Sequence, residues 1–469
     1  MSFYVFNSLG KQKEEFIPLE KNHVGLYTCG PTVYNFAHIG NLRTYIFEDV
    51  LKKSFEYLNY DVKHVMNITD VGHLQSDADT GEDKMELGAK RENKTVWEIA
   101  KFYEEEFFMD CQKLNIKRPS IVCRATEHIK EMIELVQLLE KKGYTYVSNG
   151  NVYFEIDKFK DYNKLANLSM EELEAGSRVE LDENKKNPLD FVLWFTNSKF
   201  KNQIMQWESP WGRGFPGWHL ECSAMSMKYL GERIDIHCGG IDHIPVHHTN
   251  EIAQSEAALG HKWVDYWMHG EFLVVDGGKM SKSSGDFLTL SRIIEEGFSA
   301  LDYRFFCLQS RYRKQLLFSF DALRDAATSL KKLKSKIAAI ADSVNDKDIV
   351  DSKKLKEYKE KFSTQISDDL NMPNAFTVLY DVIKDSELKA KEKIALVKDF
   401  DTVFSLNLLE KDLEDLSEVD EELIAKLIAD RNEARSSKNW AKADEIRDKL
   451  NEMNIELIDT KEGVSWKLK

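Results

Sequence analysis

A βαβ unit is the first structure that the pattern of apolar and polar positions predicts. Residues 61–68 alternate and are rich in β-branched side chains, as in a strand, and a similar run extends from Val24 to Cys29. Between these runs, one helical face is formed by Tyr45, Ile46, Val50 and Leu51. Two strands joined in this way lie parallel in one sheet. Ligands bind at the carboxyl ends of parallel strands, where we expect Cys29, Gly30 and Thr69.

An insertion follows this unit. The pattern predicts a helix over Ile129–Lys141, a hairpin turn at Asn149-Gly150 and a buried strand over Phe191–Phe195. Strand and helix alternation resumes at Trp207, so we place the insertion at about residues 126–202.

The last third of the chain is helical in pattern. After about Phe318, Gly and Pro become sparse and Lys, Glu, Leu and Ala dominate. Two apolar stripes are typical of a helical bundle: Leu330, Leu333 and Ile337, then Leu370, Phe376 and Leu379. A final unit begins near Glu418, with one strongly charged helix expected from about Glu421 to Met453.

Composition narrows the class of protein. A chain of 469 residues is too long for one core and suggests two to four domains. The net charge of −15 argues against a protein that coats nucleic acid, although a local basic face can still bind RNA. The six cysteines have no regular spacing, so a disulfide scaffold is excluded and the thiols are available for metal. Without an apolar stretch of about 18 residues or a secretory signal, we expect no membrane partner and a cytoplasmic protein.

Lys279-Met280-Ser281-Lys282-Ser283 is the most specific motif in the chain. Two ammonium groups on a mobile loop can neutralise a polyphosphate leaving group, which is the chemistry that Lys279 and Lys282 supply. Gly277, Gly278 and Gly285 would let the loop move. The alternative is a solvated Lys/Ser loop without a ligand.

His38-Ile39-Gly40-Asn41 opens the helix after the first predicted strand. Partial positive charge gathers at a helix start, Gly40 permits close approach of a nucleotide, and His38 can donate to an α-phosphate. A structural cap is the alternative for His38. Together with the lysine loop, the motif predicts ATP binding.

A metal site is predicted from thiol, imidazole and carboxylate groups. His247 and Glu251 are four residues apart, on one face of a helix, and Cys222 and Cys29 precede them. This donor set suits Zn²⁺ better than Mg²⁺ or Ca²⁺. The alternatives are a buried cysteine unrelated to a helical His–Glu pair, or ligation by the nearby Cys238, His243 or His248.

The charged C-terminal stretch holds candidate RNA contacts. Aromatic stacking with hydrogen-bonding neighbours is how unpaired bases are usually read, and Trp440 lies among basic residues. However, Trp440 shares a helical stripe with Ala443, Ile446 and Leu450, which is equally typical of a core position.

The lysine loop and the His38–Asn41 motif together resemble the paired signature of class I aminoacyl-tRNA synthetases, with Asn41 at the place of the usual second histidine. The resemblance to the cysteinyl-tRNA synthetases is closer and extends from about residue 2 to Trp466. It is carried by residues 27–34 (YTCGPTVY), 187–194 (NPLDFVLW), 217–225 (GWHLECSAM) and 247–254 (HHTNEIAQ).

This resemblance implies a fold and its domains. We expect an α/β protein with a Rossmann-like parallel-sheet catalytic domain, an inserted subdomain, an α-helical bundle and a small anticodon-binding domain. The implied boundaries are residues 1–125 and 203–275 for the two catalytic halves, 126–202 for the inserted connective subdomain, 276–317 for the stem-contact region with the lysine loop, 318–417 for the bundle and 418–469 for the anticodon-binding domain.

The resemblance also implies roles for single residues. One Zn²⁺ would be held by Cys29, Cys222, His247 and Glu251, and joined by the thiol of the substrate. Thr32, Thr69, Trp218 and His237 would surround bound cysteine, and His38, Gly40 and Lys282 would contact Mg²⁺-ATP, with His38, Asn41, Lys279 and Lys282 as the catalytic set. Arg435, Trp440 and Asp444 would read the anticodon.

The expected activity is ATP-dependent formation of cysteinyl-adenylate and transfer of cysteine to the 3′ end of tRNA(Cys), by a monomer. Two alternatives differ in chemistry. A cysteine ligase with an amino-sugar acceptor would need no RNA-reading arm after Phe318, and a non-catalytic RNA-binding relative would not need Lys279, Lys282 and His38.

Overall fold

The structure is a computed structural model. It describes residues 2–72, 84–167, 183–197, 204–275, 278–279, 288–345, 352–410, 421–437, 439–452, 455–460 and 463–468. The chain divides into two compact units, Met1–Leu333 with Ile340–Leu408 and Lys334–Ala339 with Leu409–Lys469. No helix within the described part of the chain is long and apolar enough to cross a membrane.

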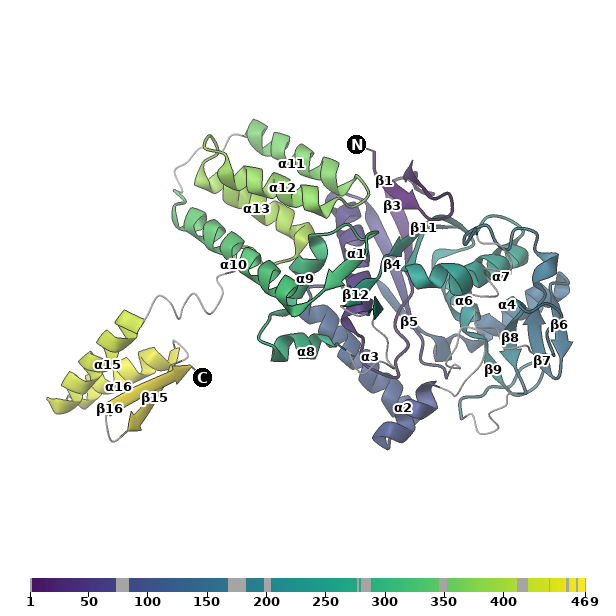
Figure 1. Cartoon of the computed structure of the whole chain (residues 1–469), viewed down its shortest axis with the longest axis horizontal. Coiled ribbons are helices and arrows are strands. Elements are labelled where there is room, and N and C mark those ends of the chain that lie inside the picture. The colour runs from purple at the N-terminus through teal and green to yellow at the C-terminus, as the bar shows by residue number, and fades with distance from the viewer. Residues whose placement is uncertain are drawn as a thin grey trace. The chain divides into compact units, whose positions relative to one another are not determined.

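A five-stranded parallel sheet forms the centre of the first unit (Figure 1). Its strand order is β11-β10-β3-β4-β5, and every neighbouring pair is parallel. The strands are β3 (His23–Thr28), β4 (Asp61–Ile68), β5 (Ile121–Arg124), β10 (Ile234–Gly240) and β11 (Val264–Gly270). The predicted βαβ unit is therefore confirmed, with β4 at the predicted bounds and α1 (Ile39–Tyr57) between the strands.

Helix α1 is buried on more sides than its apolar stripe predicts. Tyr45, Ile46, Val50 and Leu51 are buried as expected, but so are Glu48, Asp49 and Lys52. The helix packs on β4 and β10 on one side and on α9 (Ala300–Leu308) and α13 (Ala390–Phe404) on others. Helix α1, with its buried polar residues, thus lies between the central sheet and the helices α9 and α13.

His64 on β4 has a buried imidazole, and Lys52 of α1 is a neighbouring charge. Its Nε2 lies 3.0 Å from the Thr28 hydroxyl, and burial, with a smaller effect of Lys52, lowers the pKa of His64 to about 3. The unfolded chain takes up this proton near pH 6.5, so stability falls as the pH decreases below that value. Between pH 6.5 and about pH 5, we expect His64 to remove about 1.6 kcal/mol from the free energy of unfolding.

Urea unfolding of the wild type and of His64→Gln at both pH values tests this expectation. The difference between the two proteins should shrink by about that amount at the lower pH. Parallel pH dependences in the two proteins would contradict it.

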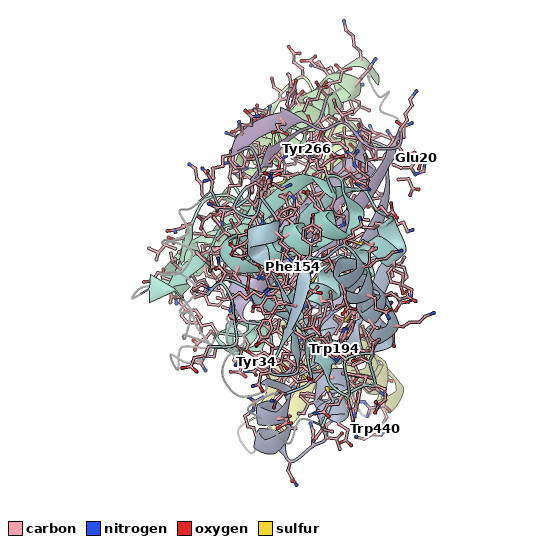
Figure 2. All side chains as sticks on the ribbon, turned by 90° about the vertical axis from the view of Figure 1, so that its right-hand side faces the viewer. Glu20, Tyr34, Phe154, Trp194, Tyr266 and Trp440 are labelled. Atoms are coloured by element: carbon pink, nitrogen blue, oxygen red, sulfur yellow. The ribbon has the colours of Figure 1, made fainter. Side chains whose placement is uncertain are left out.

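The insertion forms a four-stranded antiparallel sheet, β6-β7-β8-β9. Its elements are α4 (Ile129–Lys141), β6 (Thr145–Ser148), β7 (Asn151–Phe154), β8 (Phe191–Phe195) and, beyond residue 202, β9 (Phe215–Pro216). Asn149 and Gly150 have φ of 47° and 87°, which confirms the predicted hairpin turn. Phe154 and Trp194, both fully buried, are labelled on this sheet in Figure 2.

Smaller elements surround the central sheet. A hairpin of β1 (Tyr4–Asn7) and β2 (Gln12–Glu15) begins the chain, and a three-stranded sheet joins β12 (Leu273–Val275), β13 (Gly278–Lys279) and β14 (Leu316–Phe318). Further helices of the first unit are α2 (Lys84–Glu92), α3 (Val96–Lys113), α6 (Trp218–Leu230), α7 (Thr249–Leu259) and α8 (Leu290–Glu295). A π-helical turn, Ile244–His248, leads directly into α7.

Four helices follow the three-stranded sheet, as the apolar stripes predict (Figure 1). They are α10 (Phe320–Asp342), α11 (Ser352–Ile366), α12 (Met372–Lys384) and α13. The predicted core residues of both stripes, from Leu330 to Leu379, are buried. Leu370 lies just before α12, in a left-handed conformation with φ of 51°.

Arg304 on α9 joins α13 to the sheet domain. Its fully buried guanidinium donates to Asp49 Oδ2 at 2.6 Å, to the Phe404 carbonyl at 2.7 Å and to the Leu114 carbonyl at 3.0 Å. Removing one partner of a buried ion pair leaves the other charge without compensation. We expect Arg304→Met to lower the free energy of unfolding by about 3–5 kcal/mol, measured by urea denaturation.

The matched control is Arg324→Met. Arg324 forms an equally short ion pair with Asp321, but both side chains are mostly exposed. Its loss should change stability by less than about 1 kcal/mol. Equal losses in the two variants would show that the Arg304 contacts do not stabilise the unit.

The second unit corrects one prediction. In place of one helix from Glu421 to Met453, there are two, α15 (Glu421–Ser436) and α16 (Trp440–Glu452), followed by a hairpin of β15 (Ile455–Thr460) and β16 (Gly463–Leu468). Asn439 separates the helices because its side chain accepts from the Lys442 backbone N–H at 3.3 Å, as an N-cap does. The apolar stripe from Trp440 to Leu450 is compatible with one long helix as well as with two, so it did not reveal this interruption.

Candidate metal and nucleotide site

The carboxyl ends of the central strands border a cavity of about 220 Å³. Cys29 directly follows β3, and Thr69 directly follows β4 and pairs with Thr32 in an isolated parallel bridge. Cys222 and His247 line this cavity, and so do His38, Gly40 and Asn41. One continuous cavity thus joins the predicted metal ligands to the predicted ATP motif.

The four predicted metal ligands come together in three dimensions. Cys29 Sγ lies 4.0 Å from Cys222 Sγ, Cys222 Sγ lies 3.6 Å from His247 Nε2, and His247 Nε2 lies 2.8 Å from Glu251 Oε1. All four side chains are buried, and their ligating atoms lie within 4.8 Å of one another. His247 lies in the π-helical turn and Glu251 in α7, so their helix is not α-helical throughout as the spacing predicts.

Burial and neighbouring charges shift the pKa values of the side chains in this cluster. Burial opposes charge on Glu251, but His237 and His247 lower the pKa of Glu251 to about 2. Burial also opposes charge on His247, but Glu251 and Cys222 raise the pKa of His247 well above its usual value. Burial and the neighbouring Cys222 raise the pKa of Cys29, whereas contact with Cys29 lowers the pKa of Cys222. The cluster therefore favours an ionised Glu251 carboxylate, and it favours deprotonation of Cys222 over deprotonation of Cys29.

These donors fit a thiophilic divalent cation. Two sulfurs, one imidazole nitrogen and one carboxylate oxygen are a common Zn²⁺ donor set. Glu251 Oε1 is buried and accepts no hydrogen bond among the described residues, and His247 Nε2 lies 2.8 Å from it as an ion-pair partner. Cys238 is buried on β10, outside both possible ligand groups within the described residues.

His38 is the N-cap of α1. Its Nδ1 accepts the Asn41 backbone N–H at 3.0 Å, and the Asn41 side chain accepts the His38 backbone N–H at 3.3 Å. Since Nδ1 accepts a hydrogen bond, the proton of the neutral ring is on Nε2, which can donate. This capping box gives Asn41 a structural role that does not need a second histidine.

The lysine loop begins and ends beside the His38 turn. Of the motif, Lys279 is described, and Met280–Ser283, which include Lys282, lie in a gap before Leu288 that is outside the described residues. Before it, Lys279 pairs with Val274 across β13 and β12, and Leu273 of β12 lines the cavity near Gly40. After it, the Leu288 carbonyl accepts from the Ile39 N–H at 2.9 Å. The described residues on both sides of the second ATP motif therefore lie next to the first one.

The predicted substrate residues divide into two groups. Thr32, Thr69 and Trp218 line the cavity, and the half-buried Trp218 ring lies 4.8 Å from the His247 ring, so Trp218 is not a core residue. The Thr69 hydroxyl donates to Glu221 at 2.9 Å. His237 is fully buried, is not among the residues that line the cavity, and contacts Glu251 Oε2 at 2.8 Å.

Sequence patterns did not reveal several residues that line the cavity. These are Phe36, Tyr103, Phe107, Glu271 and Leu273, whereas Tyr34, which is labelled in Figure 2, is the last residue of the 27–34 motif. They come from loops, α3 and the edge of the three-stranded sheet, where no motif indicates a ligand.

The predicted anticodon residues lie on the two helices of the second unit. Arg435 on α15 is exposed, and Trp440 at the start of α16 is 59% exposed, whereas Ala443, Ile446 and Leu450 are buried. The core interpretation of Trp440 is therefore wrong. Asp444 is exposed and pairs with Arg447 at 3.1 Å.

Comparison with known proteins decides the family. Residues 15–328 match the family described as "tRNA synthetases class I (C) catalytic domain". The chain is 51% identical to the cysteine–tRNA ligase of Treponema denticola, with all of both chains covered. The chain belongs to the cysteine–tRNA ligase family. The cysteine–tRNA ligase of Borreliella burgdorferi, also covered completely, is 45% identical.

Membership of the cysteine–tRNA ligase family agrees with the fold. Methionyl-tRNA synthetase of Mycobacterium tuberculosis, solved in complex with methionyl-adenylate, matches 82% of this chain and 90% of its own with a TM-score of 0.55. At 15% identity, this likeness shows the fold alone. The α/β class I synthetase fold and the family predicted from the motifs are confirmed.

Proposed function

We propose that this protein is a cytoplasmic, monomeric cysteine–tRNA ligase. It would form cysteinyl-adenylate from L-cysteine and Mg²⁺-ATP, and then transfer the cysteinyl group to the 3′ end of tRNA(Cys), releasing AMP and diphosphate. The observation that supports this most strongly is the single cavity that joins the Cys29–Cys222–His247 cluster to the His38–Asn41 turn.

Cys29, Cys222, His247 and Glu251 would hold one Zn²⁺ in this proposal. When bound, the ion supplies a preference for thiolate over alcohol, which packing alone cannot provide because cysteine and serine differ by one atom. Thr32, Thr69 and Trp218 would enclose the substrate beside this cluster. The donor set would thereby favour a substrate side chain that carries a thiol.

The chain's own groups would stabilise charge during activation. The N-terminus of α1 carries partial positive charge, and Gly40 lines the cavity beside His38. His38 Nε2 would donate to the α-phosphate, while Lys279 and Lys282 would neutralise the leaving diphosphate. Asn41 would contribute by holding the His38 ring through the capping box.

We assign the remaining parts as the resemblance implies. Residues 1–125 and 203–275 would form the catalytic domain, 126–202 the connective subdomain, 276–317 the stem-contact region, 318–417 the bundle and 418–469 the anticodon-binding domain. Exposed Trp440 could stack on an unpaired base, with Arg435 and Asp444 as hydrogen-bonding neighbours.

Aminoacylation of unfractionated tRNA with each amino acid in turn tests the proposal. We expect ATP-dependent charging with cysteine and none above background with serine. Transfer of cysteine to an amino sugar, without charging of tRNA, would favour the second ligase hypothesis. Absence of cysteine-dependent ATP–pyrophosphate exchange would contradict any catalytic function.

A further inference from the structure

Two further imidazoles lie against the same metal cluster. His237 Nε2 lies 2.8 Å from Glu251 Oε2, and His248 Nε2 lies 3.3 Å from Cys29 Sγ and 3.9 Å from Glu251 Oε1. Both imidazoles are fully buried. The ligating atoms of Cys29, His237, His248 and Glu251 lie within 4.8 Å of one another, as do those of the set that contains Cys222 and His247.

His248 is oriented as metal-bound histidines usually are. Such histidines commonly hydrogen-bond through their second ring nitrogen, which aims the first at the ion. His248 Nδ1 lies 2.7 Å from His269 Nε2, and His269 Nδ1 lies 2.7 Å from the Ser8 hydroxyl. In the first set, His247 Nδ1 lies 2.9 Å from His219 Nδ1. Each set therefore contains a histidine whose Nδ1 contacts a neighbouring imidazole.

The surroundings of His237 and His248 are shaped for these rings. The His237 ring stacks on Trp267 with centroids 4.5 Å apart, and its Nδ1 has no hydrogen-bond partner among the described residues. A Cβ atom at Gly239 would lie only 2.7 Å from His248 Cε1, so glycine is needed for this imidazole to fit. Hydrogen bonds to Glu251 alone do not explain the arrangement, because His248 Nε2 is too far from its carboxylate.

Charge balance favours the second set in a buried site. Cys29 and Cys222 as thiolates with ionised Glu251 carry three negative charges, so a divalent cation would leave one charge unbalanced. Cys29 as a thiolate with ionised Glu251 and two neutral imidazoles carries two, which a divalent cation neutralises. Uncompensated charge is costly away from water. The first set has one more sulfur ligand, which a thiophilic cation prefers. The second set forms a site whose total charge with the cation is zero.

We propose that Cys29, His237, His248 and Glu251 form a second ligand set for a thiophilic divalent cation such as Zn²⁺ or Co²⁺. It overlaps the first set at Cys29 and Glu251, and it holds the ion when Cys222 and His247 are not available. This inference rests on the proposed metal site, but not on the charging of tRNA.

Metal binding to the full-length protein tests the inference. Zn²⁺ and Co²⁺ affinities are measured by competition with a chelator for wild type, Cys222→Ser and Cys222→Ser/His247→Gln, and far-UV circular dichroism checks the fold of each. We expect one ion per chain in all three, bound about 10- to 100-fold more weakly in the double variant. X-ray absorption should find two sulfur neighbours per ion in the wild type and one in both variants.

The deciding step adds a third substitution to the double variant. His248→Ala should remove the remaining stoichiometric binding, whereas His64→Ala, at another buried histidine outside the cluster, should not. A folded Cys222→Ser or double variant without metal would overturn the inference, as would retention after His248→Ala. Aminoacylation of tRNA by the wild type is scored separately, so failure of the proposed function has a different signature.

Discussion

Glu251→Gln is expected to lose stoichiometric metal binding and to lower cysteine-dependent ATP–pyrophosphate exchange by about 100-fold or more. Glu251 lies in both ligand sets, is fully buried and faces His237 and His247 through its two oxygens. Glutamine keeps the size of the side chain but removes the charge that a divalent cation requires. Metal content is measured by elemental analysis after dialysis. The rate of ATP–pyrophosphate exchange is measured with labelled pyrophosphate.

The control for this prediction is Glu256→Gln on the same helix. Glu256 accepts from the Trp263 backbone N–H at 3.3 Å, away from the cluster, and glutamine preserves an acceptor there. Its metal content and exchange rate should match those of the wild type. If Glu251→Gln kept one tightly bound ion per chain, neither ligand set would be correct.

Lys282→Ala is expected to lower the rate of ATP–pyrophosphate exchange by about 10²- to 10³-fold, with a smaller effect on the apparent affinity for cysteine. The lysine stabilises charge that develops on the leaving diphosphate, which is largest in the transition state. The described residues on either side of its loop lie beside the His38 turn, because Leu273 of β12 lies next to Gly40 and the Leu288 carbonyl accepts from the Ile39 N–H.

Lys130→Ala provides the comparison for a lysine without a proposed role. Lys130 is 84% exposed on α4 and pairs only loosely with Glu134, at 3.6 Å. Its exchange rate should not change. An unchanged rate in Lys282→Ala would show that the loop motif does not take part in activation.

Local structure could be predicted where one face of an element meets the core. The bounds of β4 and α4, the hairpin at Asn149-Gly150 and the buried positions of α10 follow from periods of two and 3.6 residues. The break at Asn439 could not be predicted in this way, because the apolar stripe from Trp440 to Leu450 is compatible with one long helix as well as with two. The burial of Glu48, Asp49 and Lys52 on α1 was also hidden, since it depends on α9 and α13 packing against a polar face.

The candidate site shows the same division. The sequence alone determined the chemical types and the spacing of its residues, namely the two lysines of the loop, the thiols and the His247–Glu251 pair. Only the tertiary structure decided that Cys29 Sγ lies 4.0 Å from Cys222 Sγ across 193 residues of chain, and that Asn41 caps α1. It also decided that His237 and His248 face the cluster while His237 does not line the cavity.

The reason lies in the range of the forces. Helix and strand periods follow from hydrogen bonds and side-chain directions within a few residues, so a sequence window contains them. Distances between distant side chains depend on strand order and on how the layers pack, which no window contains. Motif residues therefore indicated which chemistry the chain can perform, and the order β11-β10-β3-β4-β5 decided which of them meet.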